Sequence, residues 1–330
     1  MFGEKFATRL NSFASKPDIY WGKSIPSLTP ARLIERASKV KGLTDLDLNY
    51  PDHAEHNLKE ILKIIRNYGL NVNGLAMRYY TNPAFKLGAF TNPDKKVRQE
   101  AIDLTKKGID AARESNSNLM TIWLGQDGFD YGFQVDYKKI WQEEIDAIRE
   151  VASHDKECQI SIEYKPNEPR AYSLLANLPL TLLAIKEINL DNLGVTLDFA
   201  HILYADEQPA FAAAMVARNS KILGLHLNDG YAKRDDGLMV GSVHQLATIE
   251  LLYQVHKDGY DGTIYFDTFP DASGLDPVKE CEANISTVKK MLKVVEKLSG
   301  DNNLSLAIQN QDAVTSNQIF NKALYNSNID

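Results

Sequence analysis

The sequence predicts an α/β protein, a (β/α)₈ TIM barrel with a C-terminal helical extension. Short apolar runs rich in β-branched and aromatic residues alternate with longer segments of helical periodicity, and eight such pairs follow one another. Four of the later runs end in an acid or a histidine, and active sites of these barrels lie at the C-terminal ends of the strands. An open doubly wound sheet is the alternative, but the first strand lacks the GxGxxG turn typical of that fold.

Eight short runs are expected to form parallel strands joined by right-handed helical crossovers. The strand segments are 6–14, 43–50, 72–80, 119–125, 159–166, 193–200, 222–229 and 263–270. The helical segments are 29–40, 56–69, 94–115, 136–154, 178–188, 208–220, 245–259 and 276–298. In the second of these helices, Leu58, Ile61, Leu62 and Ile65 recur at three- and four-residue steps, which predicts one apolar face.

The chain is expected to divide at the end of the last of these helices. Residues 1–298 form the predicted barrel domain, and residues 299–330 form a linker followed by a helical tail. The stretch LSGDNNLS at 298–305 has the composition of a linker, and residues 307–328 are expected to form one more helix. This helix is predicted to pack through a thin apolar face on the barrel or on a neighbouring subunit.

Composition places the chain among globular proteins with an ordinary core. It has 330 residues, of which 44% are hydrophobic and 25% charged, and a formal net charge of −7. The acidic balance argues against a nucleic-acid partner, and the absence of a long apolar run argues against a membrane span. The two cysteines, Cys158 and Cys281, lack CxxC spacing, and residues 1–14 carry charges where a signal peptide needs its apolar stretch. These features predict a cytoplasmic protein.

Four successive strand ends carry the strongest chemical signal in the sequence. Glu163, Asp198, His226 and Asp267 each follow an apolar run, where an ionised side chain is costly unless something compensates its charge. One divalent ion shared by all four is the simplest compensation. A single imidazole among carboxylates suits Mn²⁺, Co²⁺ or Mg²⁺ better than structural zinc, and we favour Mn²⁺.

A second ion is a further expectation. His201 lies three residues after Asp198, and the loop after His226 carries Asp235 and Asp236. Asp198, His201 and one of these two aspartates have the right chemistry for a second site. A solvated acidic turn is the alternative for the RDDG stretch, because such residues favour turns.

Several other side chains are candidates for catalysis or substrate binding. Lys165 lies two residues after Glu163, so both point to one face of the strand, where Lys165 either polarises a substrate oxygen or pairs with Glu163. His53 is a candidate proton shuttle, since histidine titrates near neutrality. Aromatic residues suit the apolar face of a sugar, and hydroxyl groups need polar partners. These candidates are Trp21, Trp123, Phe269, Gln126 and Asp127.

The pattern resembles the xylose isomerase-like barrel superfamily. It consists of ExK on the fifth strand (163–165), DxxH after the sixth (198–201), His226 on the seventh and Asp267 on the eighth. Within that superfamily the chain is most similar to bacterial L-rhamnose isomerases of broad sugar specificity. The similarity extends to EPR at 168–170, HLND at 226–229, DDGLMVGS at 235–242 and the tail 309–325.

The resemblance implies a metal-dependent interconversion of aldose and ketose by C1–C2 hydrogen transfer on an unphosphorylated sugar. Glu163, Lys165, His53 and Asp235 are then the catalytic candidates, and Trp123, His201, Phe269 and Gln126 the substrate-binding ones. It also implies a homodimer or homotetramer. The open alternatives are a ketose 3-epimerase of the tagatose 3-epimerase type, a metal-dependent endonuclease and a non-catalytic sugar-binding barrel. The epimerases of this superfamily typically carry a glutamate where Asp267 stands.

Overall fold

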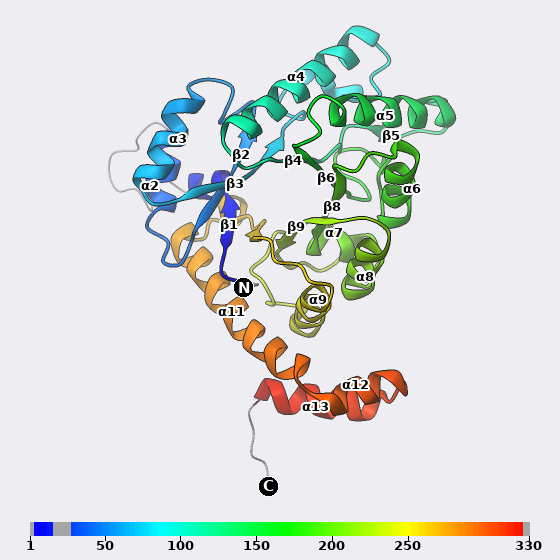
Figure 1. Ribbon diagram of the computed structural model, residues 1–330. Helices are drawn as coiled ribbons and strands as arrows, with labels where there is room; N and C mark the ends of the chain where they lie inside the picture. Colours follow the sequence, from blue (N-terminus) through cyan, green and yellow to red (C-terminus); the bar gives the residue numbers. More distant parts are fainter. Residues whose placement is uncertain (1–2, 16–27, 326–330) are drawn as a thin grey trace.

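Eight parallel strands close into a barrel in the computed structural model, which describes residues 3–15 and 28–325 (Figure 1). Around the barrel the strands follow the order β1, β10, β9, β8, β6, β4, β3, β2. They are β1 (Phe6–Arg9), β2 (Asp45–Tyr50), β3 (Asn71–Met77), β4 (Leu119–Ile122), β6 (Gln159–Glu163), β8 (Leu193–Asp198), β9 (Ile222–Leu227) and β10 (Ile264–Phe266). The predicted TIM barrel is confirmed. Each barrel strand lies within an expected segment except β3, which begins one residue before its segment, and residues 10–14 of the first expected strand are a 3₁₀ helix instead.

Eight long helices surround the barrel, and each corresponds to a helical segment expected from the sequence. They are α2 (Pro30–Ala37), α3 (Leu58–Asn67), α4 (Lys95–Glu114), α5 (Tyr137–Ala152), α6 (Leu178–Ile188), α8 (Pro209–Asn219), α9 (Gln245–Lys257) and α11 (Pro277–Ser299). The four apolar residues expected on one face of α3 are all buried. The periodicity therefore identified the face that packs on the barrel.

Short elements that the sequence did not indicate lie in the loops at the C-terminal ends of the strands. They are the 3₁₀ helices η1 (Leu10–Ala14) and η2 (Pro83–Leu87), the short helices α7 (Phe199–Tyr204) and α10 (Pro270–Ser273), and the antiparallel pair β5 (Gly128–Phe129) and β7 (Tyr172–Ser173). Each is a few residues long, too short to show a period of hydrophobicity.

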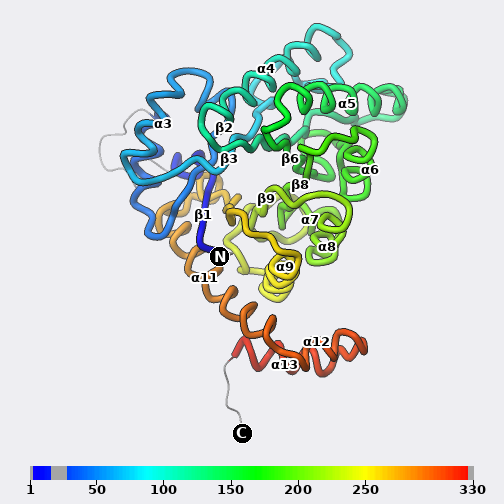
Figure 2. The backbone as a smooth tube through the Cα atoms, viewed as in Figure 1, coloured from blue at the N-terminus to red at the C-terminus, as the bar shows by residue number. Residues whose placement is uncertain are grey.

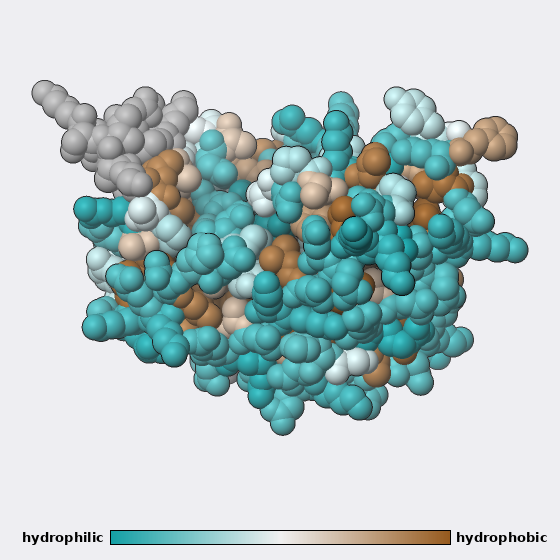
Figure 3. All heavy atoms as spheres, turned by 90° about the horizontal axis from the view of Figure 1, so that it is seen from above, coloured by the Kyte–Doolittle hydropathy of each residue, from teal (hydrophilic) through white to brown (hydrophobic). Residues whose placement is uncertain are grey.

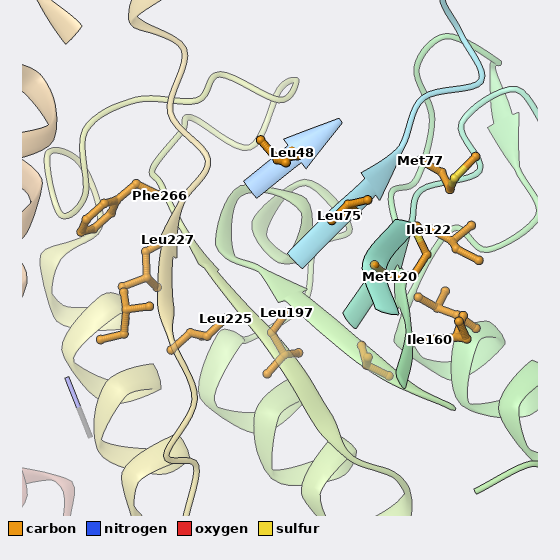
Figure 4. Packing of buried hydrophobic residues seen from close by; sticks show 14 of the residues in the cluster. Leu48, Leu75, Met77, Met120, Ile122, Ile160, Leu197, Leu225, Leu227 and Phe266 are labelled. Atoms are coloured by element: carbon orange, nitrogen blue, oxygen red, sulfur yellow. The ribbon is translucent and has the colours of Figure 1, made fainter. Parts of the chain in front are cut away.

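The two-residue period of the strands separates the apolar core from the barrel interior. Apolar side chains from seven of the strands are buried together, as Figure 4 shows; those labelled there are Leu48, Leu75, Met77, Met120, Ile122, Ile160, Leu197, Leu225, Leu227 and Phe266. The residues that alternate with them are polar on β6 and β8, where the hydroxyls of Ser161 and Thr196 lie 2.5 Å apart. Polar side chains on alternating positions are thereby brought inside the barrel.

The C-terminal region contains two helices instead of the predicted linker and single helix. Helix α11 continues to Ser299, α12 spans Asn302–Gln309 and α13 spans Ala313–Tyr325, so the segment expected to be a linker is mostly helical (Figure 2). Asp301 caps α12 by accepting hydrogen bonds from the backbone of Asn303 and Leu304. Polar residues at helix caps have the composition of a linker, which explains the misreading. Phe320 packs against the core, as expected of the tail.

The outer surface of the protein is mostly polar on the face seen in Figure 3, as is usual for a globular protein. The face shown in Figure 3 is mostly hydrophilic, with apolar residues in small separate patches. No helix in the described ranges is both long and apolar enough to span a membrane. Cys158 and Cys281 are buried free thiols.

An aromatic and acidic cluster supports the loop after β3. Tyr79 packs edge-to-face on Phe85 and Phe90, and all three are fully buried, so they form part of the core. Beside them, Asp127 accepts hydrogen bonds from the backbone of Ala89 and from Thr91. The carboxyl of Glu144 on α5 is enclosed near Asp127 and has no hydrogen-bond partner among the described residues. Burial, then the charge of Asp127, raises the pKa of Glu144 well above its usual range.

Glu144 therefore makes the free energy of unfolding depend on pH. Because its folded pKa is raised, the contribution of Glu144 to the free energy of unfolding is most favourable below the unfolded pKa of about 4.3 and decreases as pH rises above it. In the native protein this decrease in the free energy of unfolding amounts to at most about 1.4 kcal/mol per pH unit above that value. We expect the Glu144→Gln variant to lack this decrease. Urea unfolding from pH 5 to 8 measures it: the variant's advantage should grow with pH, while Glu100→Gln at an exposed position of α4 should match the native protein. A pH-independent difference would contradict this account.

Candidate functional site

The four acidic and histidine strand ends converge at one mouth of the barrel. Ligand atoms of Glu163, Asp198, His226 and Asp267 all lie within 4.8 Å of one another. Glu163 and Asp198 are the last residues of β6 and β8, His226 lies on β9, and Asp267 follows β10. Asp198 pairs in register with His226, so neighbouring strands present their side chains at the same level. The geometry brings together the four residues that the sequence assigned to one metal ion.

Asn228 fixes the orientation of Asp198. Its amide donates hydrogen bonds to both carboxylate oxygens of Asp198, at 3.2 and 3.1 Å, and to the carbonyl of Asp267. Its side-chain oxygen accepts a hydrogen bond from the backbone of Ala200 at 2.8 Å. These contacts tie the ends of β8, β9 and β10 together through one side chain. Asparagine after a strand is a common turn residue, so nothing in the sequence distinguishes Asn228 from an ordinary turn position.

The four residues fit a divalent cation. The Nδ1 atom of His226 lies 3.5 Å from Glu163 Oε1 and 4.0 Å from Asp198 Oδ2, yet it is buried without a hydrogen-bond partner among the described residues. Two buried carboxylates, one partly buried carboxylate and one imidazole form an oxygen-rich set, which suits Mn²⁺, Co²⁺ or Mg²⁺. An unpartnered ring nitrogen facing carboxylates is what a metal ligand requires.

Electrostatic coupling inside the cluster is strong. Burial opposes ionisation of Glu163, but the neighbouring His226 and His201 lower its pKa to about 2. Burial also disfavours charge on His226, yet Glu163 raises the pKa of that imidazole to about 9. Burial raises the pKa of Asp198 to about 7 despite His201. Without a metal ion the cluster therefore holds protons that a cation must displace.

Arg9 neutralises the outer side of the cluster. Its guanidinium lies 3.8 Å from Asp267 and 3.2 Å from Asp271, and it stacks 4.7 Å from the centre of the Phe269 ring. Burial disfavours charge on the Asp267 carboxyl and raises its pKa, an effect that Arg9 partly offsets. The sequence did not single out Arg9, because it comes from β1 and lies in sequence far from the residues it contacts.

Lys165, Asp235 and His201 form a second group beside the first. The Asp235 carboxylate lies 3.1 Å from Lys165 Nζ and 3.1 Å from His201 Nε2, and Lys165 also pairs with Glu168 at 2.9 Å. Burial disfavours charge on His201, but Asp198 and Asp235 raise its pKa to about 10. Lys165 is thus not paired with Glu163, which was one reading of its position. Within the described ranges no second set of three or more metal-ligand residues converges, so a second ion stays a prediction.

Asp235, and not Asp236, reaches the barrel mouth. The carboxylate of Asp236 accepts hydrogen bonds from the backbone of Tyr231 and from Arg234, at 2.8 Å each, and this residue does not line the cavity. It stabilises the turn, as the solvated-turn reading of the RDDG stretch suggested. The next residue, Gly237, has φ of 57°, in the left-handed region that glycine adopts easily, and this turn directs Asp235 inward.

A cavity of about 490 Å³ opens at the cluster. The described residues that line it are Arg9, Asp47, Ala76, Arg78, Tyr80, Trp123, Gln126, Glu163, Lys165, Glu168, Pro169, His201, His226, Asp235, Tyr265, Asp267 and Phe269. Trp123 packs against Tyr80 and lies 5.1 Å under the ammonium of Lys165. Gln126 is buried there with its side-chain oxygen unpartnered. Trp123, Phe269 and Gln126 thus stand where the sequence expected substrate-binding residues.

Two expected residues stand apart from this cavity. His53 is buried, accepts a hydrogen bond at Nδ1 from the backbone of Asn49 and is not among the lining residues. Burial, reinforced by Arg78 and Arg9, lowers its pKa to about 4, so the ring stays neutral near pH 7. The carboxylate of Asp127 accepts hydrogen bonds from the backbone of the loop after β3, and Asp127 too is not among the residues that line the cavity. Trp21 lies outside the described residues.

Besides Arg9, the sequence did not single out Asp47, Arg78 and Tyr265, which also line the cavity. Asp47 and Tyr265 lie on β2 and β10, where strand alternation places them inside the barrel, and Arg78 follows β3. Burial raises the pKa of Asp47 to about 7, although Asn73 donates a hydrogen bond to it. The alternating acids of DLDLNY at 45–50 were a signal for an inward-facing polar position.

A family model described as a xylose isomerase-like TIM barrel matches residues 37–294. The chain belongs to this family. The superfamily resemblance is therefore confirmed. The family match does not distinguish L-rhamnose isomerases from other members of the family.

Curated relatives of the chain include two xylose isomerases. That of Thermus thermophilus is 27% identical over 223 residues, which are 66% of this chain and 58% of the relative. That of Thermus caldophilus is 25% identical with the same coverage. The matched region is thus less than two thirds of the length of either relative.

Solved structures of similar fold include sugar epimerases. The structure of an L-ribulose 3-epimerase has a TM-score of 0.71 at 14% identity, covering 92% of this chain and 99% of that one. A D-tagatose 3-epimerase-like protein has a TM-score of 0.67 at 18% identity, covering 88% and 98%. At these identities the likeness shows the fold alone.

Removal of the Asn228 amide should weaken metal binding. We expect Asn228→Ala to lower Mn²⁺ affinity about 10- to 100-fold, because Asp198 loses the donors that orient it. Isothermal titration of the metal-free protein measures this. Asn303→Ala on the distant α12 should bind as the native protein does, and equal affinity of all three proteins would refute the role given to Asn228.

Proposed function

We propose that this protein is a metal-dependent aldose–ketose isomerase acting on an unphosphorylated sugar, of the L-rhamnose and xylose isomerase type. The observation that carries the proposal is the contact between the two groups of the site. Lys165 and Asp235, 3.1 Å apart and both largely buried, adjoin the four metal-ligand residues and line the same cavity. A cation, a lysine and a carboxylate at one point are what a C1–C2 hydrogen transfer requires.

Glu163, Asp198, His226 and Asp267 would hold the ion, for which Mn²⁺ is our first choice and Co²⁺ or Mg²⁺ the next. Such an ion supplies a Lewis acid for two adjacent sugar oxygens. Arg9 holds Asp267 and Asn228 holds Asp198, so the ligand carboxylates are oriented before the substrate arrives. We further propose that His201 and Asp235, with Asp198, take a second ion when one is present.

The remaining steps fall to Lys165 and Asp235. Lys165 donates a hydrogen bond to the carbonyl oxygen at C1, where negative charge develops as hydrogen leaves C2 with its electron pair. Asp235 accepts the proton of the C2 hydroxyl, and the same proton is returned to the oxygen at C1. Burial disfavours charge on Asp235, but His201 and Lys165 lower its pKa well below its usual value, so it is ionised near neutral pH.

The cavity walls suit a sugar. Trp123, Tyr80 and Phe269 offer aromatic surface for the C–H face of the ring, and Gln126 has a free acceptor for a hydroxyl. We assign His53 no proton-transfer step, because its ring is held neutral and lies outside the lining. A cytoplasmic location is a proposal from the composition and cysteine usage of the chain, and assembly as a homodimer or homotetramer is a proposal from the resemblance.

A ketose 3-epimerase is the second candidate. Epimerisation needs two acid–base groups on opposite faces of one carbon, and Asp267 opposite Glu163 is the pair available. Asp267 is bound to Arg9 and belongs to the ligand cluster, so it is poorly placed to act as a second base. The net charge of −7 disfavours an endonuclease, and the buried Lys165–Asp235 pair disfavours a purely sugar-binding barrel.

A panel of unphosphorylated aldoses and ketoses with Mn²⁺, Co²⁺ or Mg²⁺ tests the proposal. We expect aldose–ketose conversion that stops on exhaustive chelation and returns with metal. Products that differ only in configuration at C3 would establish the epimerase instead. Retention of substrate deuterium from C2 at C1 of the product would support direct hydrogen transfer, and solvent exchange would support a base-catalysed route.

Lys165→Gln tests the role of the ammonium. We expect kcat to fall about 10²- to 10³-fold, because the variant loses the charged donor at the developing oxyanion. Mn²⁺ affinity should stay within error of the native value, since Lys165 is not a ligand. Lys186→Gln on the exposed face of α6 is the matched control. A variant that loses metal binding together with activity would show that Lys165 supports the cluster and not the reaction.

A further inference from the structure

Arg78 faces the metal-ligand cluster from the opposite wall of the barrel. It follows the last residue of β3, its backbone N–H donates to Tyr50 O at 2.8 Å, and its side chain lines the cavity. In the closed strand order, three strands separate β3 from β9 in either direction. Strand β3 is therefore diametrically opposite the strand that carries His226. A substrate spanning the cavity from the ligand cluster reaches Arg78 with its far end.

Arg78 has no close ion-pair partner among the residues that the structure describes, although its charge acts on Asp52 and Glu163 at longer range. Its Nε atom is buried without a hydrogen-bond acceptor, and no carboxylate of a described residue lies within 4.0 Å of its guanidinium. Its aromatic neighbour is Tyr80, with the ring centre at 5.8 Å. The other two cations of the cavity differ, because Arg9 pairs with two aspartates and Lys165 with Glu168 and Asp235.

A partly buried guanidinium without an acceptor is costly unless a ligand supplies one. We propose that Arg78 binds a carboxylate of the substrate, so that the sugar is a sugar acid whose carboxylate lies at the end remote from the reacting carbons. This inference rests on the proposed isomerase function. It narrows the substrate from unphosphorylated sugars in general to those that carry a carboxylate.

The cavity favours a carboxylate over a phosphate. A guanidinium binds a planar carboxylate through two parallel hydrogen bonds, and one arginine suffices for that geometry. Phosphate sites commonly use backbone amides of glycine-rich loops or helix N-termini, and no glycine is among the described lining residues. Five acidic residues line the same cavity, so a dianion meets more repulsion than a monoanion; they are Asp47, Glu163, Glu168, Asp235 and Asp267.

Matched pairs of hexoses and hexuronates test this inference. D-glucuronate differs from D-glucose, and D-galacturonate from D-galactose, only in a carboxylate at C6. We expect the metal-loaded enzyme to convert the better uronate with a kcat/KM about 10- to 100-fold above that of its hexose. The corresponding 6-phosphates form a third arm. Equal rates for uronate and hexose, or preference for the 6-phosphate, would overturn the assignment of a carboxylate.

Two substitutions separate recognition from simple charge balance. Arg78→Gln should reduce the preference for uronate over hexose about 10-fold or more, and Arg78→Lys should restore part of it because it keeps the charge without the fork. Arg66→Gln, an exposed charge change on α3, should leave the preference as it is. If Arg78 merely offset the charge of the ligand cluster, Arg78→Gln would lower both substrates equally and change Mn²⁺ affinity, and the inference would fail.

A binding measurement keeps this result distinct from a failure of the proposed function. Calorimetric titration with D-glucuronate and D-galacturonate, each with and without Mn²⁺, compares native protein with Arg78→Gln. If no sugar is converted but a uronate binds the native protein at least 10-fold more tightly than the variant, the isomerase assignment fails and the carboxylate site stands. If sugars are converted but uronate affinity is the same in both proteins, the carboxylate site fails and the isomerase assignment stands.

Discussion

The burial of Glu163, Asp198, His226 and Asp267 at one end of the barrel is the constraint on which the rest of the site depends. Their ligand atoms lie within 4.8 Å of one another, in a place where each ionised group has lost most of its contact with water. Like charges at that distance repel strongly unless protons or a cation intervene. The opposed pKa shifts of Glu163 and His226 express this coupling, and a divalent ion relieves it with the least rearrangement.

Barrel closure makes this arrangement possible, and a small number of polar contacts hold it in place. Strands β6, β8, β9 and β10 are neighbours in the sheet, so their ends arrive at one level and on one side. Asn228 then joins three of these ends, and Arg9 binds Asp267 from β1, where the first and last strands meet. The turn that brings Asp235 inward completes the link to Lys165. Supporting residues of this kind fix the orientation of the side chains in the cluster, and a site needs the correct orientation as well as the correct residue types.

The two arginines and the lysine of the cavity have different surroundings, which suggests that they have different roles. Arg9 is occupied by aspartates, Lys165 lies between Glu168 and Asp235, and Arg78 has no acceptor for its buried Nε among the described residues. A cation that is paired with acidic side chains stabilises the protein's own charges. A cation without such a partner is available to bind a ligand. The two sides of the barrel mouth therefore differ in charge, with the acidic cluster on β6–β10 at one side and Arg78 at the other.

The sequence by itself determined the barrel, its eight strands and the four residues that converge at its mouth, because period-two alternation and polar strand ends are local patterns. It also indicated Lys165, Trp123, Phe269 and Gln126, which line the cavity. Only the tertiary structure decided between Asp235 and Asp236, set His53 and Asp127 outside the cavity, and brought in Arg9, Asp47 and Arg78. Those outcomes depend on loop turns and on contacts between strands distant in sequence, and such contacts leave no periodic trace along the chain.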